Sequence, residues 1–230
     1  MTQRSILAGK NPTVIIKAGA NITVRGYESD LVSAETSGVG GLQIEKRGKS
    51  EVGRARAAIG DHVLFDVRLN LPKWKGKNTP EEVIEVQMGG SGQVLVPFGS
   101  NLKVYAGTDS DVQGVQGQVD AYAGLKLSLQ DVYCLGYASS GGKMEIDCQT
   151  MSEKEVKFEA GSDLRFHVRD LTSARIRVRD LGGYWEARIG DGEKSVYLKS
   201  GGDVTLVTDQ KVEALPPNYV LGRIERPAAS

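Results

Sequence analysis

Apolar and polar residues alternate in short segments along most of this chain. In His62–Leu71 every second position from Val63 to Leu69 is apolar, and Asp66 and Arg68 stand between them. A period of two is typical of a strand with one buried face. The same pattern predicts short strands over residues 13–16, 22–24, 30–36, 42–44, 83–88 and 93–96. The sequence therefore indicates an all-β fold.

One longer pattern predicts a turn followed by a strand. It consists of a small or aromatic residue, Gly, a small residue, Asn or Asp, and then an aliphatic, a polar and an apolar residue. It occurs three times, over Ala18–Val24, Phe98–Val104 and Ala160–Phe166. Gly and Asn or Asp favour the turn, and the alternate apolar residues after them favour inward-facing strand positions.

From residue 101 onward, the predicted strands are short and closely repeated. Gly or Asp separates segments of three to five residues every seven to ten positions, up to residue 207. Strands this short bury little surface alone, but stacking each on its equivalent in the next coil gives every inward Val, Leu or Ile a like neighbour. We therefore expect a parallel β-helix, or β-solenoid.

The alternative fold is an antiparallel β-sandwich or barrel. It would follow if Asn101–Val119 formed a hairpin pair. Against it, Asp191-Gly192 is the only Asn-Gly or Asp-Gly dipeptide in the sequence, and such dipeptides are the strongest hairpin signal.

A single β-solenoid domain is predicted over residues 13–210. Within it, residues 13–92 form an irregular N-terminal part with an exposed basic loop at 72–80, and residues 93–210 form the regular stack. Residues 1–12 and 215–230 lack the pattern and are interpreted as terminal tails or caps.

The composition suits a chain that turns often, since 29 of the 230 residues are Gly and 7 are Pro. Lys plus Arg and Asp plus Glu both number 29, so the net charge favours no nucleic-acid partner. Residues 1–80 nevertheless carry 13 basic against 7 acidic residues, and residues 81–160 carry 5 against 12. If the coils stack in sequence order, this segregation would steer one copy onto another; the alternative is chance.

The two cysteines, Cys134 and Cys148, lack metal-ligand spacing. Two small buried thiols and a disulfide between neighbouring coils both fit the sequence. Only the geometry of the two residues decides between them.

Three stretches carry a resemblance to a known family: ANITVRGYESDLVSAET from residue 20, QVLVPFGSNLKVYAGTDSDVQGVQGQVDAY from residue 93 and LKSGGDVTLVT from residue 198. They are similar to the bacterial adhesin-like family of domains of unknown function and, more distantly, to bactofilin-type β-helices. The resemblance covers roughly residues 13–210. It implies a right-handed parallel β-helix-like fold and an association with the bacterial surface or envelope stress.

The sequence holds no motif of nucleophilic, phosphate-binding or zinc chemistry. G-x-S-x-G, the P-loop and H-E-x-x-H do not occur, and His62 and His167 each stand in a predicted strand without a companion at ligand spacing. We therefore predict no catalytic, cofactor or metal site, and a chain that is not an enzyme.

The basic loop offers one candidate contact with a polymer or partner. Trp74 lies between Lys73 and Lys75, and exposed aromatic residues flanked by Lys occur at binding surfaces. The alternative is a Trp folded back over the sheet edge, with the two lysines blocking that edge.

A second candidate contact is a row of arginines. Period-two alternation places two sets of cations on the outer face of adjacent strands, namely Arg165, His167 and Arg169, and Arg175, Arg177 and Arg179. Such a row can bind the phosphate or sulfate groups of an anionic polymer. The interleaved aspartates favour a lattice of ion pairs instead, namely Asp163, Asp170 and Asp180.

Three functions follow as hypotheses. The first is a non-enzymatic structural or interaction β-solenoid, self-associating through its end coils or adhesin-like at a bacterial surface or envelope. The second is a binding module for an anionic or carbohydrate polymer, and the third is a solenoid polysaccharide lyase or hydrolase. The N-terminus lacks a signal-peptide core and no run of apolar residues is long enough to span a membrane, so we expect a cytoplasmic chain unless it is exported by another route.

Overall fold

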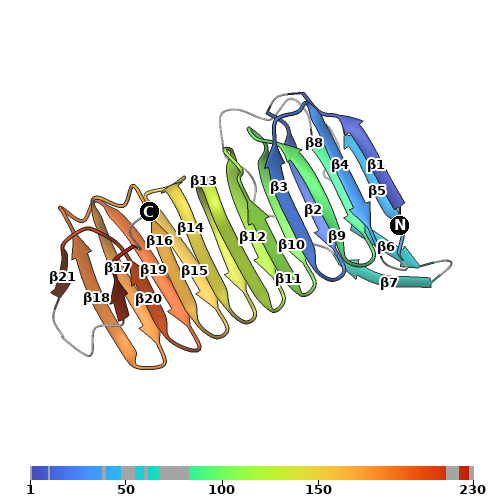
Figure 1. The fold of residues 1–230 in the computed structure, drawn as a ribbon. Helices are drawn as coiled ribbons and strands as arrows, with labels where there is room; N and C mark the ends of the chain where they lie inside the picture. The colour runs from blue at the N-terminus through green and yellow to red at the C-terminus, as the bar shows by residue number, and fades with distance from the viewer. Residues whose placement is uncertain are drawn as a thin grey trace.

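The structure is a computed structural model that describes residues 2–9, 11–37, 40–47, 55–59, 62–67, 83–215 and 223–227. This part of the chain is all-β, as the alternating pattern predicts (Figure 1). The strands are β1 (Thr2–Leu7), β2 (Thr13–Ala18), β3 (Ile22–Tyr27), β4 (Leu31–Thr36), β5 (Leu42–Arg47), β6 (Ala55–Ile59), β7 (His62–Val67), β8 (Val83–Met88), β9 (Gly92–Pro97), β10 (Asn101–Ala106), β11 (Asp109–Gln113), β12 (Gln118–Ala123), β13 (Lys126–Ser140), β14 (Met144–Met151), β15 (Glu155–Ala160), β16 (Leu164–Val168), β17 (Ala174–Asp180), β18 (Gly183–Ile189), β19 (Lys194–Ser200), β20 (Val204–Val207), β21 (Val212–Leu215) and β22 (Arg223–Glu225).

Strands that follow one another along the chain lie mostly in two different layers. Layer A holds, in spatial order, β5, β8, β2, β10, β12, the second half of β13, β15, β19, β17, β18 and β21. Layer B holds β1, β4, β9, β3, β11, the first half of β13, β14, β16, β20 and β22. We call a layer A strand and the layer B strand that follows it a rung.

The rungs do not stack in sequence order. Strand β2 pairs in parallel with both β8 and β10, so the rung of β2 and β3 lies between two rungs that come much later in the chain (Figure 1). The condition of sequence-ordered stacking, on which the charge-steering idea depends, therefore does not hold for the N-terminal part. Asn101–Val119 does not act as a hairpin pair, because β10 pairs in parallel with β2 and β12.

A column of glycines forms the first corner, where the chain passes from layer A to layer B within a rung. The backbone N–H of Gly124 donates to the carbonyl oxygen of Ala106 at 3.1 Å, and that of Gly141 donates to Ala123 at 3.0 Å. A Cβ on Gly124 would lie against the carbonyl oxygen of Gly107 far inside contact distance. The same close approach recurs along the stack at Gly19, Gly107, Gly124, Gly141, Gly161 and Gly201.

The three turn-and-strand segments do not occupy equivalent places. Each precedes a strand whose alternate residues are buried, as predicted. Gly19 and Gly161 lie at the first corner, but Gly99 lies between β9 in layer B and β10 in layer A. That passage from one rung to the next is the second corner.

The hydrophobic core fills the space between the two layers. Inward residues such as Val14, Val104 and Leu127 are fully buried, and the rings of Phe158 and Phe166 meet from opposite layers with centroids 5.5 Å apart. Burial of a large apolar side chain contributes about 1.5–3 kcal/mol, which is how such short strands become stable in a stack.

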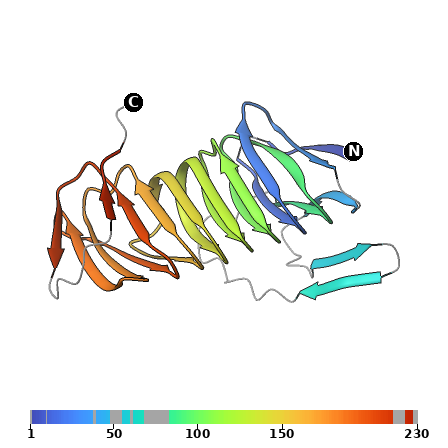
Figure 2. The same ribbon diagram turned by 60° about the horizontal axis from the view of Figure 1, so that its bottom comes forward.

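Antiparallel strands flank the parallel stack at the N-terminal end and, at the other end, in layer A only. At the N-terminal end, β4 and β5 run antiparallel to β9 and β8. At the other end, β18 runs antiparallel to β17 and β21 antiparallel to β18, whereas layer B ends in β22, which is parallel to β20. The hairpin of β6 and β7 is a separate pair that lies away from the stack (Figure 2). Among the described residues, no helix is long and apolar enough to cross a membrane.

Candidate ligand-binding groove at the second corner

The second corner carries a groove along the stack. Its volume is about 610 Å³. Its lining comes from consecutive rungs, which bring Phe98, Gly114, Gln116, Asp131, Val132, Tyr133 and Gln149 together. Because neighbouring parallel strands lie about 4.8 Å apart, a groove that crosses several rungs is elongated along the stack axis.

Backbone hydrogen bonds hold the rungs of this corner in register. The N–H of Gln116 donates to the carbonyl oxygen of Phe98 at 2.8 Å, and that of Tyr133 donates to Val115 at 2.8 Å. Each donor lies one rung further along the stack than its acceptor, so the side chains of adjacent corners are set side by side.

Two aromatic side chains stand exposed at the groove. Phe98 is 38% exposed and Tyr133 is 55% exposed. The floor between them is apolar, since Val132 is 1% exposed. Exposed aromatic rings beside an apolar residue are a frequent feature of binding sites.

Asp131 stands at the bend of β13, where this continuous strand passes from layer B to layer A. Its φ is 51°, the left-handed region, and no other non-glycine residue in the described part of the chain has a positive φ. Asp tolerates this region better than most residues, but the conformation still costs free energy. The bend places the carboxylate in the groove lining.

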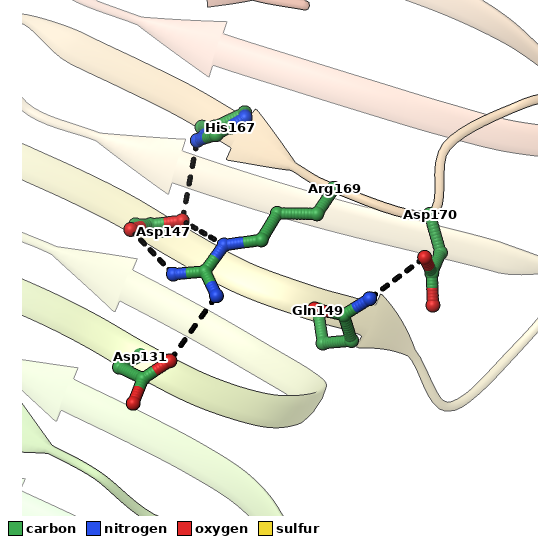
Figure 3. A network of polar contacts seen from close by, with 6 residues as sticks. All are labelled: Asp131, Asp147, Gln149, His167, Arg169 and Asp170. Carbon is green, nitrogen blue, oxygen red and sulfur yellow. Dashed lines mark hydrogen bonds and ion pairs between the residues drawn. The ribbon is translucent and has the colours of Figure 1, made fainter. Parts of the chain in front are cut away.

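A polar network on layer B fixes that carboxylate (Figure 3). Arg169 donates to both oxygens of Asp147, from Nε at 3.2 Å and from Nη2 at 3.0 Å, and its Nη1 donates to Oδ1 of Asp131 at 3.2 Å. The hydrogen bonds to Asp147 are the largest cause that raises the pKa of the Arg169 guanidinium. The second oxygen of Asp131 points away from Arg169 (Figure 3).

Two further residues complete the network. His167 places Nδ1 3.2 Å from Oδ1 of Asp147. Gln149 donates from Nε2 to Oδ1 of Asp170 at 2.7 Å, so its amide is oriented where it lines the groove. Within the described ranges no cluster of His, Cys, Asp and Glu could hold a metal ion.

The predicted arginine row splits between the two layers. Strand β16 pairs in layer B and β17 in layer A, so the expectation of adjacent strands is wrong. Arg175, Arg177 and Arg179 are exposed on β17, as the alternation predicts. Arg175 and Arg177 both pair with Glu186 of β18, Arg177 at 3.5 Å.

The ion-pair alternative for these cations fits better than an open row. Arg165 pairs with Glu225, and Arg169 with Asp147 and Asp131. The partners come from neighbouring strands and corners. Of the interleaved aspartates predicted for this role, Asp180 accepts instead from the indole of Trp185 at 3.0 Å.

The remaining candidates are the residues of the basic loop and the two cysteines. Trp74, Lys73 and Lys75 lie outside the described residues. Cys134 and Cys148 are both free, Cys148 buried and Cys134 half-buried, so no disulfide joins the coils.

The groove was not predicted from the sequence. Phe98 and Tyr133 are far apart along the chain, and the turn residues around them give no sign that the two rings are exposed at one site. Comparisons with protein-family models, with curated proteins and with solved structures find no match to this chain. The adhesin-like resemblance therefore stays a prediction.

Proposed function

We propose that this chain is a non-enzymatic binding module, a β-solenoid of two-strand rungs, whose second-corner groove binds a segment of a carbohydrate polymer. The parallel pairing of successive rungs supports the solenoid class, because each strand stacks on its equivalent. The rigid stack presents the groove, and the chemistry of the groove selects the ligand.

The observation that carries this proposal is the pairing of exposed aromatic rings with amides and one carboxylate. Sugar rings have an apolar face that stacks on Phe98 and Tyr133, and hydroxyl groups around the rim that exchange hydrogen bonds with amides and carboxylates. Gln116, Gln149 and Asp131 supply both donors and acceptors. A few oriented polar groups around apolar walls are the usual composition of a ligand site.

The charges around the groove favour an uncharged sugar chain over an anionic one. Arg169 is the cation bound to the groove lining, and two carboxylates already neutralise it. An anionic polymer would have to displace Asp131 or Asp147 to reach the guanidinium. The groove crosses several rungs, so it extends along the stack axis, and this suits a linear chain rather than a compact ligand.

Titration calorimetry with soluble hexasaccharides of β-linked glucose, β-linked N-acetylglucosamine and α-linked glucose tests the proposal. We expect one of them to bind, and Tyr133→Ala to weaken that affinity about tenfold because a stacking surface is lost. Tyr184→Ala is the matched control, since Tyr184 is 40% exposed on β18, away from the groove. Binding of none of the three, or equal weakening by both variants, would contradict the proposal.

Self-association is the second candidate function, and the end strands favour it. Leu7 on β1 is 65% exposed and Ile224 on β22 is 37% exposed, so each end of the stack presents an apolar side chain. It ranks second because antiparallel strands interrupt parallel growth at the N-terminal end and in layer A at the other end, which leaves only the layer B strand β22 in the parallel direction there. Light scattering over about a hundredfold range of protein concentration tests it, and a constant monomer mass would rule it out.

A further inference from the structure

The outer face of layer A carries a second aromatic surface, away from the groove. Tyr105, Tyr122 and Tyr137 stand on consecutive strands β10, β12 and β13. Tyr105 and Tyr122 are direct neighbours in register, and Tyr137 lies beside Asp120 of β12. Tyr122 is 45% exposed and Tyr137 is 48% exposed. We call these three tyrosines the tyrosine platform.

Two of the three platform tyrosines lie toward the edge opposite the groove, and Tyr137 lies nearer the middle of the sheet, in register with Asp120. Tyr105 and Tyr122 each stand one residue before the end of their strand, next to the glycine corner. The groove lies where the layer A strands begin. A short ligand bound in the groove would therefore not cover the tyrosine platform.

A local irregularity of the sheet shapes the platform. A β-bulge interrupts the register between Val119 and Asp120 of β12, and the extra residue on β13 is Gly136. A Cβ on Gly136 would collide with the Asp120 carboxylate, so the glycine makes room for it beside Tyr137. Bulges of this kind redirect side chains and are frequent next to functional sites.

The charged groups around the platform neutralise one another. Lys103 lies beside Asp120 in register, and Gln118 donates to Asp120 at 3.4 Å. One strand further along, Lys157 pairs with Glu159 at 2.9 Å and lies over the ring of Tyr197, 5.6 Å from its centroid. The surface thus offers aromatic rings and hydrogen-bonding groups with little unbalanced charge.

The charged form of the Asp120 side chain is disfavoured by its partly buried position. Burial is the largest cause that raises the pKa of its carboxyl, and burial likewise raises the pKa of the Tyr105 phenol. A carboxylate that the fold disfavours, beside exposed tyrosines, fits a binding role better than a role in stability.

We propose that the tyrosine platform binds the flat surface of an insoluble, uncharged β-linked polysaccharide, with Tyr122 and Tyr137 stacking on sugar rings and Asp120 accepting from hydroxyl groups. This goes beyond the groove, which takes a single soluble chain. A flat row of strands cannot enclose one chain, but it matches chains packed side by side. Lys103 and Lys157 lie beside carboxylates of the same surface, and this disfavours binding of an anionic polymer.

Sedimentation of the full chain with microcrystalline cellulose and with chitin tests the proposal. We expect the protein to bind at least one of the two solids and to sediment with it, which we call retention. The double variant Tyr122→Ala, Tyr137→Ala should bind that solid about tenfold more weakly. The double variant Tyr122→Phe, Tyr137→Phe keeps the rings and should keep the retention, which separates lost stacking from misfolding. High salt should leave the retention unchanged, because no ion pair with the polymer is involved.

Two controls separate the platform from the groove. Tyr133→Ala should bind the soluble hexasaccharide about tenfold more weakly and keep sedimentation with the solid, whereas the double alanine variant of the platform should keep the hexasaccharide affinity and sediment less. Tyr184→Ala should change neither. No retention on either solid, full retention by the double alanine variant, or release by salt would overturn the platform. None of these three outcomes bears on the groove, whose binding of soluble hexasaccharides is tested by calorimetry.

Discussion

The two corners of each rung differ in almost every respect. The first corner repeats one residue, glycine, from rung to rung, and its backbone atoms are too close for a Cβ. The second corner changes from rung to rung and carries Phe98, Gln116, Asp131 and Tyr133. In this stack the rungs approach closely at the first corner, where only glycine fits, and the second corner tolerates different residues. The uniform corner is thus suited to stability and the variable one to binding.

The largest effect is expected from breaking the uniform corner. Gly124→Ala places a Cβ against the carbonyl oxygen of Gly107, and both atoms belong to the backbone, so one rung must shift. We expect a loss of about 3 kcal/mol or more in the free energy of unfolding, as for other forced overlaps in a packed interior. Urea denaturation measures it.

Gln116→Ala at the variable corner is the control for this glycine. Its side chain is exposed, and its loss should change the unfolding free energy by less than about 0.5 kcal/mol. If Gly124→Ala were as mild as Gln116→Ala, close approach would not be the reason for the glycine column.

The sequence carries the glycine column, although the alternating pattern did not reveal it. Gly107, Gly124 and Gly141 are 17 residues apart, which is one rung. The interval from Gly161 to Gly201 is longer because the hairpin of β17 and β18 is inserted there. The turn-and-strand pattern instead groups Gly99 with Gly19 and Gly161, because a Gly followed by a small residue and Asn or Asp occurs at both corners.

Strand identity and inward alternation could be predicted because each depends on a few neighbouring residues. The place of the rung of β2 and β3 could not, since its contacts with β8 and β10 join segments far apart in the sequence. The groove has the same origin. Phe98 and Tyr133 line one groove only after β10 and β12 have stacked, so no local pattern around either residue contains the site.

The second-largest effect concerns Cys148, which is fully buried below the variable corner, in register with Val132. Burial raises the pKa of its thiol from 9.0 to about 12. The folded chain keeps this proton at a pH where the unfolded chain has lost it. The stability that the neutral thiol contributes is therefore complete below pH 9 and is lost as the pH rises toward 12, by about 1 kcal/mol per pH unit.

Urea denaturation from about pH 8 to about pH 10.5 tests this pH dependence. Cys148→Ala should show a shallower decline with pH than the parent chain, because other titrating groups are common to both. Cys134→Ala is the matched control at a half-buried thiol and should change the slope less. A parallel decline for Cys148→Ala would mean that the thiol is not the titrating group.

A smaller effect is expected when the network behind the groove is cut. Arg169→Ala removes the group that holds Asp131 and Asp147 together, and two carboxylates then repel each other beside the groove. The unfolding free energy should fall by less than about 1 kcal/mol, since these side chains are largely exposed. Affinity for the hexasaccharide should fall about threefold as Asp131 loses its position.

Arg165→Ala is the matched control for Arg169→Ala. Arg165 lies on β16, the strand that Arg169 directly follows, and its loss breaks an ion pair with Glu225 of β22 without touching the groove. Equal affinities for the two variants would show that Arg169 has no role in positioning Asp131. Arg169→Lys keeps one charge but not the two-point contact with Asp147, and it should restore only part of the affinity.

The smallest effect, and the only gain, is expected at Asp120. Its folded-state pKa is raised, so the protonated form is favoured by the fold, and the resulting stability is present below the ordinary pKa of 3.8 and lost as the pH rises through the folded value. At pH 7 the carboxylate therefore destabilises the chain. Asp120→Asn should raise the unfolding free energy there by less than about 1 kcal/mol and have no such benefit near pH 3.

Asp131→Asn provides the comparison for this last prediction, because its side chain is 75% exposed and no rise in stability is expected. If Asp120→Asn stabilises the chain and also weakens its retention on cellulose or chitin, then the carboxylate is kept for binding against its effect on the fold. A stabilised variant with unchanged retention would leave the tyrosines as binding residues and remove Asp120 from the platform. A destabilised variant would mean that the hydrogen bond from Gln118 outweighs burial.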